Sequence, residues 1–116
     1  MKDKFFQVRE IMSQGSHRKT LVVSLPVAWM KKGGELNFTS IRYTRDLHVF
    51  TAEQAVRPEV ESLKKDIWYE LQKILAEGKI TLHGDNNRVE VHPIEGLYIG
   101  RPESLKCPED EYASSS

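Results

Sequence analysis

The chain has 116 residues, with 17 basic and 17 acidic side chains, and 39% of its residues are hydrophobic. This length allows one domain, or a small domain with an extension. No apolar run reaches the roughly 20 residues of a membrane span, and the first residues lack the apolar core of a signal peptide. We therefore expect a cytoplasmic protein with no membrane contact. The single cysteine, Cys107, cannot form an internal disulfide.

Charge is divided unevenly along the chain. Residues 1–52 contain nine of the basic and four of the acidic side chains, a net charge of +5, and the remaining residues carry −5. Opposed halves of this kind suggest that only the first half meets a polyanion. The alternative is that the two halves neutralise each other within one fold.

The first predicted element is a strand over Phe5–Met12, in which Phe6 and Val8 face one side and Arg9 the other. A polar loop over Ser13–Lys19 follows it.

The stretch Thr20–Lys32, TLVVSLPVAWMKK, is predicted to form a buried strand that runs directly into a short helix. Its first part is apolar and β-branched, which suits a strand. Pro26 would start the helix, because proline fixes φ near the helical value and its missing N–H is not needed in a first turn. Lys31 and Lys32 would lie at the helix C-terminus, and Gly33-Gly34 would end it.

Two further strand signals complete the first half. Leu36–Phe38 is predicted to be a brief strand or turn. Ile41–Phe50 is predicted to be a hairpin, with IRY and LHVF joined by Thr44-Arg45-Asp46.

The strand that ends in Ser24-Leu25-Pro26, followed by Trp29 and a basic end, resembles the AbrB/MazE/SpoVT group of swapped-hairpin DNA-binding domains. The archaeal branch with an S-L-P-x-x-W signature is the most similar, and the resemblance covers roughly Phe5–Glu53. It implies a homodimer in which two chains interleave their hairpins into one barrel. A dimer also suits the thin core that four short strands and a two-turn helix would give one chain.

The resemblance implies that Arg9, Arg18 and Lys19 contact duplex DNA, because they lie near the contact regions of the family. A guanidinium can bridge phosphate oxygens or pair with guanine through two hydrogen bonds. Further DNA-binding candidates in the basic half are Lys31, Lys32, Arg42 and Arg45. The structural alternatives are that Arg9 pairs with Glu10 or Glu35 and that Lys19 is only solvated.

The period of the apolar residues changes between Thr51 and Gly78, where they recur at three- and four-residue steps. This pattern predicts a long amphipathic helix with Pro58 in its first turn and Gly78 as its C-terminal stop. Its buried residues would be Val60, Leu63, Ile67, Leu71, Ile74 and Leu75.

Lys79–His92 is predicted to form a second hairpin around the turn Gly84-Asp85-Asn86-Asn87. Ile80 and Leu82 would share a face with Val89 and Val91, Pro93 would end the hairpin, and Leu97–Ile99 could form one more short strand.

Catalytic chemistry has little support. The glycines do not form a phosphate-binding loop, and no serine or cysteine lies in a nucleophile context. His83 and His92 could face each other across the second hairpin, but two imidazoles without a third ligand make a weak metal site. We expect no enzyme, no cofactor and no metal.

The sequence therefore predicts an α+β protein with three regions. Residues 1–53 would form an AbrB-like swapped-hairpin DNA-binding domain, residues 54–100 a helix and hairpin extension, and residues 101–116 a disordered acidic tail. The expected function is a homodimeric, DNA-binding transcriptional regulator. The alternative is an antitoxin-like or adaptor module whose acidic C-terminal half binds a protein partner.

Overall fold

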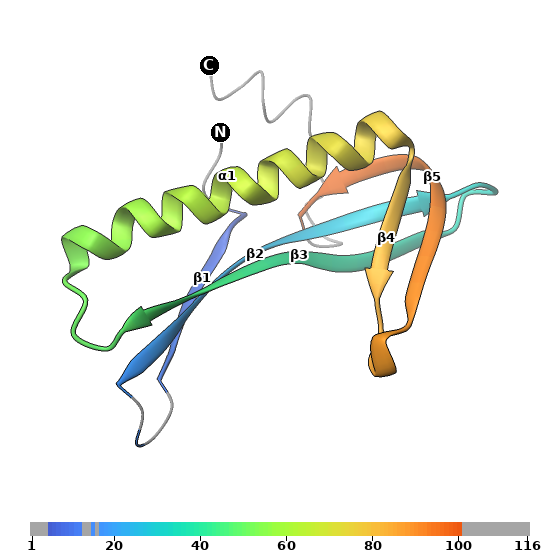
Figure 1. Ribbon diagram of the computed structural model, residues 1–116. Helices are drawn as coiled ribbons and strands as arrows, with labels where there is room; N and C mark the ends of the chain where they lie inside the picture. Colours follow the sequence, from blue (N-terminus) through green and yellow to red (C-terminus); the bar gives the residue numbers. More distant parts are fainter. Residues whose placement is uncertain (1–4, 13–14, 16, 101–116) are drawn as a thin grey trace, which may run out of the picture.

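One long helix lies across one face of an antiparallel sheet (Figure 1). The computed structural model describes residues 5–12, 15 and 17–100. In chain order the elements are β1 (Gln7–Met12), β2 (Arg18–Lys31), β3 (Leu36–His48), α1 (Glu53–Glu77), β4 (Lys79–His83), the short 3-10 turn η1 (Asp85–Asn87) and β5 (Val89–Ile99). The predicted α+β class is confirmed. The predicted acidic tail lies outside the described residues.

β2 is the central strand of the sheet. One of its edges pairs with β3 over nearly the full length of both strands. Its other edge is shared, because β1 pairs with residues 19–24 and β5 pairs with residues 27–31. Among the described strands, β4 pairs only with β5.

The short helix predicted after Pro26 is wrong, because β2 continues through Pro26 to Lys31. The carbonyl oxygen of Pro26 accepts a hydrogen bond from the Gly100 N–H at 2.9 Å, so its backbone faces the edge shared by β1 and β5. At this position β1 has not yet begun and β5 is ending. The missing proline N–H therefore removes no bond to β3.

The hairpin predicted over Ile41–Phe50 is also wrong. β3 runs unbroken from Leu36 to His48, and Thr44, Arg45 and Asp46 lie within it. The turn signal of these polar residues is overridden because β3 pairs with the long strand β2 throughout. Arg18 and Lys19, expected in a loop, are the first residues of β2.

The long helix is confirmed, with two differences. It begins at Glu53, so Pro58 lies in its second turn and not in its first. Leu75 is partly exposed, whereas Leu63, Ile67, Leu71 and Ile74 are buried. Gly78 ends the helix as predicted, with a left-handed φ of 69° and its N–H bonded to the Ile74 carbonyl.

The second hairpin is confirmed, but its register differs from the prediction by one residue. The Gly84 N–H bonds to the Arg88 carbonyl, so the turn includes more than the four predicted residues. Ile80 and Leu82 therefore face the same side as His92 and Glu90, and Val89 and Val91 lie on the other side and are exposed. A slip of one residue exchanges the faces of a strand.

β5 also continues beyond Pro93 to Ile99, so Pro93 does not end the hairpin and Leu97–Ile99 is not a separate strand. Pro93 lies opposite Lys79, in a pair that exchanges no ladder bonds with β4.

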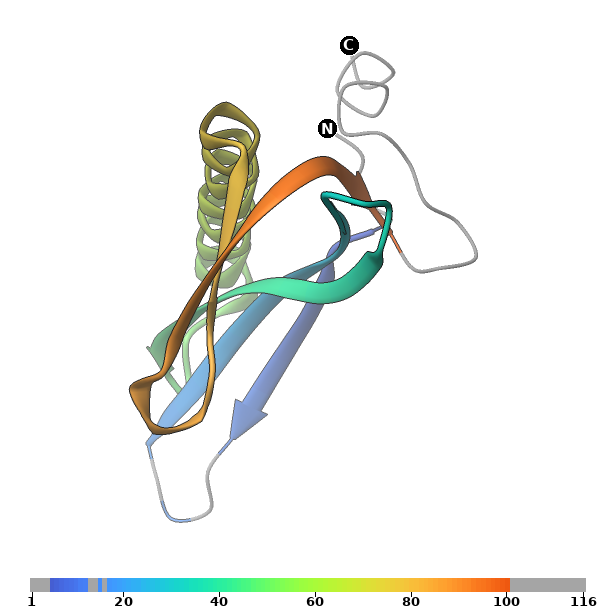
Figure 2. The ribbon, with the colours of Figure 1, turned by 90° about the vertical axis from the view of Figure 1, so that its right-hand side faces the viewer.

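The core lies between α1 and one face of the sheet. Alternate residues of β2, from Leu21 to Trp29, are buried there against the apolar stripe of α1. No described helix covers the opposite face of β1, β2 and β3 (Figure 2). None of the described helices is both long and apolar enough to cross a membrane.

Candidate nucleic-acid interface

We call the uncovered side of β1–β3 the open face. Because side chains alternate along a strand, the pairing register decides which residues share it. Its polar and charged residues are Gln7 and Arg9 of β1, Arg18, Thr20 and Ser24 of β2, and Ser40, Arg42, Thr44, Asp46 and His48 of β3.

Three of the predicted DNA-binding residues come together on the open face, one from each strand. Arg9 lies opposite Val22, Arg18 opposite His48 and Arg42 opposite Ser24, and all three arginines are exposed. From the spacing of strands and residues, the Cα atoms of Arg9 and Arg42 lie roughly 12 Å apart and those of Arg18 and Arg42 roughly 20 Å apart. Within the described residues, neither Arg9 nor Arg42 forms an ion pair.

Small hydroxyl side chains fill the space between the arginines. Asp46 is the only carboxylate on this face of the described strands β1–β3, and it accepts a hydrogen bond from the Thr20 hydroxyl at 2.9 Å. The open face is therefore basic and rich in hydroxyl groups, which are the groups that proteins use to contact phosphate and sugar.

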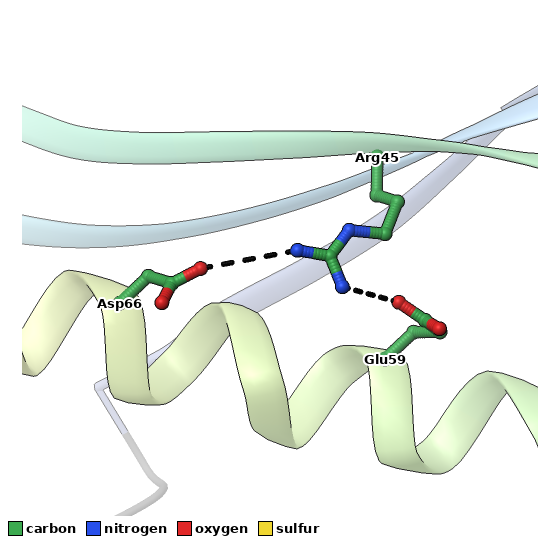
Figure 3. Close-up of polar contacts among 3 residues, drawn as sticks. All are labelled: Arg45, Glu59 and Asp66. Atoms are coloured by element: carbon green, nitrogen blue, oxygen red, sulfur yellow. Dashed lines mark hydrogen bonds and ion pairs between the residues drawn. The ribbon is translucent and has the colours of Figure 1, made fainter.

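Lys19 and Arg45 lie on the covered face instead. The Lys19 ammonium is almost buried and lies 3.4 Å from a Glu10 carboxylate oxygen. The Arg45 guanidinium donates a hydrogen bond to Glu59 and lies 3.9 Å from Asp66, so it joins β3 to α1 (Figure 3). Neither side chain is available on the open face.

Lys31 and Lys32 lie at the far end of the β2–β3 pair. The Lys31 ammonium is 3.8 Å from a Glu35 carboxylate oxygen and 5.7 Å from the centre of the Trp29 ring. Lys32 is exposed in the turn between the two strands. These two lysines do not join the three arginines.

A groove of about 900 Å³ adjoins the open face. One wall is formed by β3, and the other by β4 and the turn that follows it. Arg9 and Arg42 both line this groove, together with Ser24 and Ser40.

Sequence reasoning missed how Arg42 and Arg45 differ. The sequence contained the information needed to separate them, because residues three apart in one unbroken strand face opposite sides of the sheet. Because the prediction placed a turn at Thr44–Asp46, this alternation could not be applied. Within the described residues no group of three or more His, Cys, Asp and Glu side chains could hold a metal ion. His83 and His92 also point to opposite sides of the hairpin.

Comparison of the chain with family models, with curated proteins and with solved structures found no match.

Proposed function

We propose that this protein binds duplex DNA through the open face and regulates transcription as a homodimer. The observation that carries the proposal is the gathering of Arg9, Arg18 and Arg42, one on each of three neighbouring strands, on the uncovered side of the sheet. Duplex DNA is a dense line of negative charge, and arginines spread over roughly 20 Å could contact phosphates along several base-pair steps.

The distribution of acidic residues supports the same proposal. Glu59, Asp66 and Glu70 lie on α1, on the side of the sheet that faces away from the proposed DNA surface. Repulsion between these carboxylates and phosphate is reduced by the distance across the sheet and by salt.

The homodimer rests on two arguments. The residues Ser24-Leu25-Pro26 and Trp29 resemble swapped-hairpin domains, which implies two chains, although a continuous strand lies where that resemblance placed a helix. The outer edge of β1 offers a place for the two chains to meet. No described strand pairs with this edge, and Val8, Ile11 and Met12 of β1 are exposed apolar residues. A dimer would double the arginines that face DNA to six, which strengthens binding that depends on counterion release. Exchange of hairpins between the chains belongs to this proposal.

Fluorescence anisotropy on a labelled random-sequence duplex tests the function. We expect saturable binding whose affinity falls linearly with salt on logarithmic axes, because each phosphate contact releases counterions. If the full-length protein shows no salt-sensitive binding to duplex DNA, the proposed function is wrong.

A further inference from the structure

The outer edge of β3 carries backbone groups that no described strand uses. In an antiparallel pair, residues alternate between those that exchange hydrogen bonds with the partner strand and those whose N–H and C=O point away. The bond from the Val49 N–H to the His17 carbonyl places the odd-numbered residues of β3 in the first group. Ser40 and Arg42 therefore direct their backbone N–H and C=O outward, away from β2.

The groove beside the open face runs along this edge. Five consecutive residues of β3, Thr39–Tyr43, line it, as do Ile80–Gly84 and Glu90 of the β4–β5 hairpin. Because consecutive strand residues face opposite sides, a groove that touches all of them follows the strand edge and not one face. Figures 1 and 2 show the hairpin crossing steeply past β3, with its tip on the side of the sheet away from α1.

The two sides of the groove differ in chemistry. Ile41, Ile74 and Ile80 line it on the helix side and are largely buried. Arg9 and Arg42 line it on the open side.

The charged groups of the groove also differ in whether they have partners. Glu70 accepts a hydrogen bond from the Tyr43 hydroxyl at 3.4 Å, and Glu90 lies 3.7 Å from His92. Arg9 and Arg42 have no carboxylate partner among the described residues. Neither Tyr43 nor the His92 imidazole is a fixed cation, so Glu70 and Glu90 keep their negative charge. The two arginines on the open side of the groove are nevertheless cations without a carboxylate partner among the described residues, and they can pair with carboxylates of a ligand.

We propose that the groove binds an extended segment of a partner protein, added as a strand antiparallel to the edge of β3. Its acidic side chains face Arg9 and Arg42, and its intervening apolar side chains face Ile41, Ile74 and Ile80. A segment of five residues spans about 16 Å, and strand addition obtains affinity from main-chain bonds and specificity from alternate side chains. This inference does not rest on DNA binding, although the partner segment and DNA would compete for the two arginines.

A labelled heptapeptide tests the proposal with the full-length protein. The probe has glutamate and valine alternating between terminal glycines, and its binding is followed by fluorescence anisotropy. We expect saturable binding that weakens at least tenfold in the variant Ser40→Pro, which removes an outward N–H and places a ring at the edge. Val8→Pro is the matched control, because Val8 also points its N–H outward, but from β1. It alters the proposed dimer edge and no residue that lines the groove, so probe binding should be unchanged even if the two chains separate.

Methylation of the probe backbone tests the same contact without altering the protein. Residues opposite Ser40 and Arg42 exchange bonds with them and share their face, so the glutamate N–H groups point toward β3. We expect N-methylation of the central glutamate to weaken binding at least tenfold, and N-methylation of a valine to weaken it much less. A probe with glutamine in place of glutamate should also bind at least tenfold more weakly.

Three results would overturn strand addition at this edge. They are the absence of saturable probe binding, equal effects of the two methylations, and unchanged binding by a folded Ser40→Pro variant. Duplex DNA binding measured on the same Ser40→Pro protein should keep the salt slope of the unaltered protein, because the variant removes a hydroxyl group from the open face but no cation. Loss of probe binding and loss of DNA binding are therefore distinguishable.

Discussion

Arg42 and Arg45 show how position on a strand decides what a side chain does. Both are arginines of β3, but Arg45 faces α1 and is held by Glu59 and Asp66, whereas Arg42 faces solvent from the open face. Each ion pair of Arg45 is only partly buried, so we expect modest stabilisation from it. The main consequence of these ion pairs is that Arg45 is withdrawn from the surface proposed to meet DNA.

Trp29 is the largest side chain of β2 in the core. It is 3% exposed, and the ring of His92 stacks on it with centroids 5.0 Å apart. Trp29→Ala should lower the free energy of unfolding by about 3–5 kcal/mol in urea titrations, because it empties a packed site. In a Trp68→Phe background, a solvent-like emission maximum from Trp29 would contradict this placement.

Tyr43 gives the covered face a dependence on pH. Burial, followed by the nearby Glu70 carboxylate, raises the pKa of the Tyr43 phenol above its ordinary value of 10.0. The folded state therefore holds this proton more tightly than the unfolded state, and its contribution to stability is lost as pH rises above about 10. Urea titrations at pH 8 and pH 10.5 should show a smaller alkaline loss of stability for Tyr43→Phe than for the unaltered protein. An equal loss would mean that Tyr43 titrates normally.

At the scale of elements, β1, α1 and the presence of the β4–β5 hairpin were predictable, because their apolar periods are clear and Gly78 marks the helix end. The register of that hairpin, the length of β5 and the lengths of β2 and β3 were not. Pro26 and the polar residues around Asp46 carry strong local signals for a helix start and a turn, and only pairing between the two strands overrides them. Because these strands were predicted wrongly, the predicted set of DNA-binding residues combined Arg9, Arg18 and Arg42, which lie on the open face, with Lys19 and Arg45, which lie on the covered face.

A pair of proline substitutions tests the register of β3. Thr39 exchanges ladder bonds with Val27, whereas Ser40 points its N–H outward. Thr39→Pro should cost about 1–3 kcal/mol or more, because it leaves the buried Val27 carbonyl without a donor. Ser40→Pro should cost much less. Equal losses in thermal or urea unfolding would contradict this register.

At the scale of the whole molecule, the two sides of the sheet differ in their balance of charge, because the open face is basic and α1 has more acidic than basic residues. The arginines of the open face lie on one side, and the acidic residues of α1 lie on the other. A chain without net charge can therefore present a basic surface to a polyanion.

Association of two chains is the second expectation at this scale. Light scattering at micromolar concentration should give about twice the chain mass of 13.4 kDa. The physical reason is the unpaired edge of β1 with its exposed Val8, Ile11 and Met12, since such edges tend to pair with another chain. A stable monomer at this concentration would remove the dimer from the proposal.

The salt dependence of DNA binding by one triple variant tests the central claim most directly. Arg9→Ala, Arg18→Ala and Arg42→Ala together remove the arginines of the open face. The matched control is Lys65→Ala, Lys73→Ala and Lys79→Ala, which removes the same charge from exposed positions on α1 and β4. Circular dichroism first establishes that both variants are folded. For the arginine variant we expect weaker binding and a slope of log affinity against log salt that flattens by up to about 0.9 for each phosphate that is no longer neutralised. The control should keep nearly the slope of the unaltered protein, whereas equal slopes for the arginine variant and the unaltered protein would contradict DNA binding by the open face.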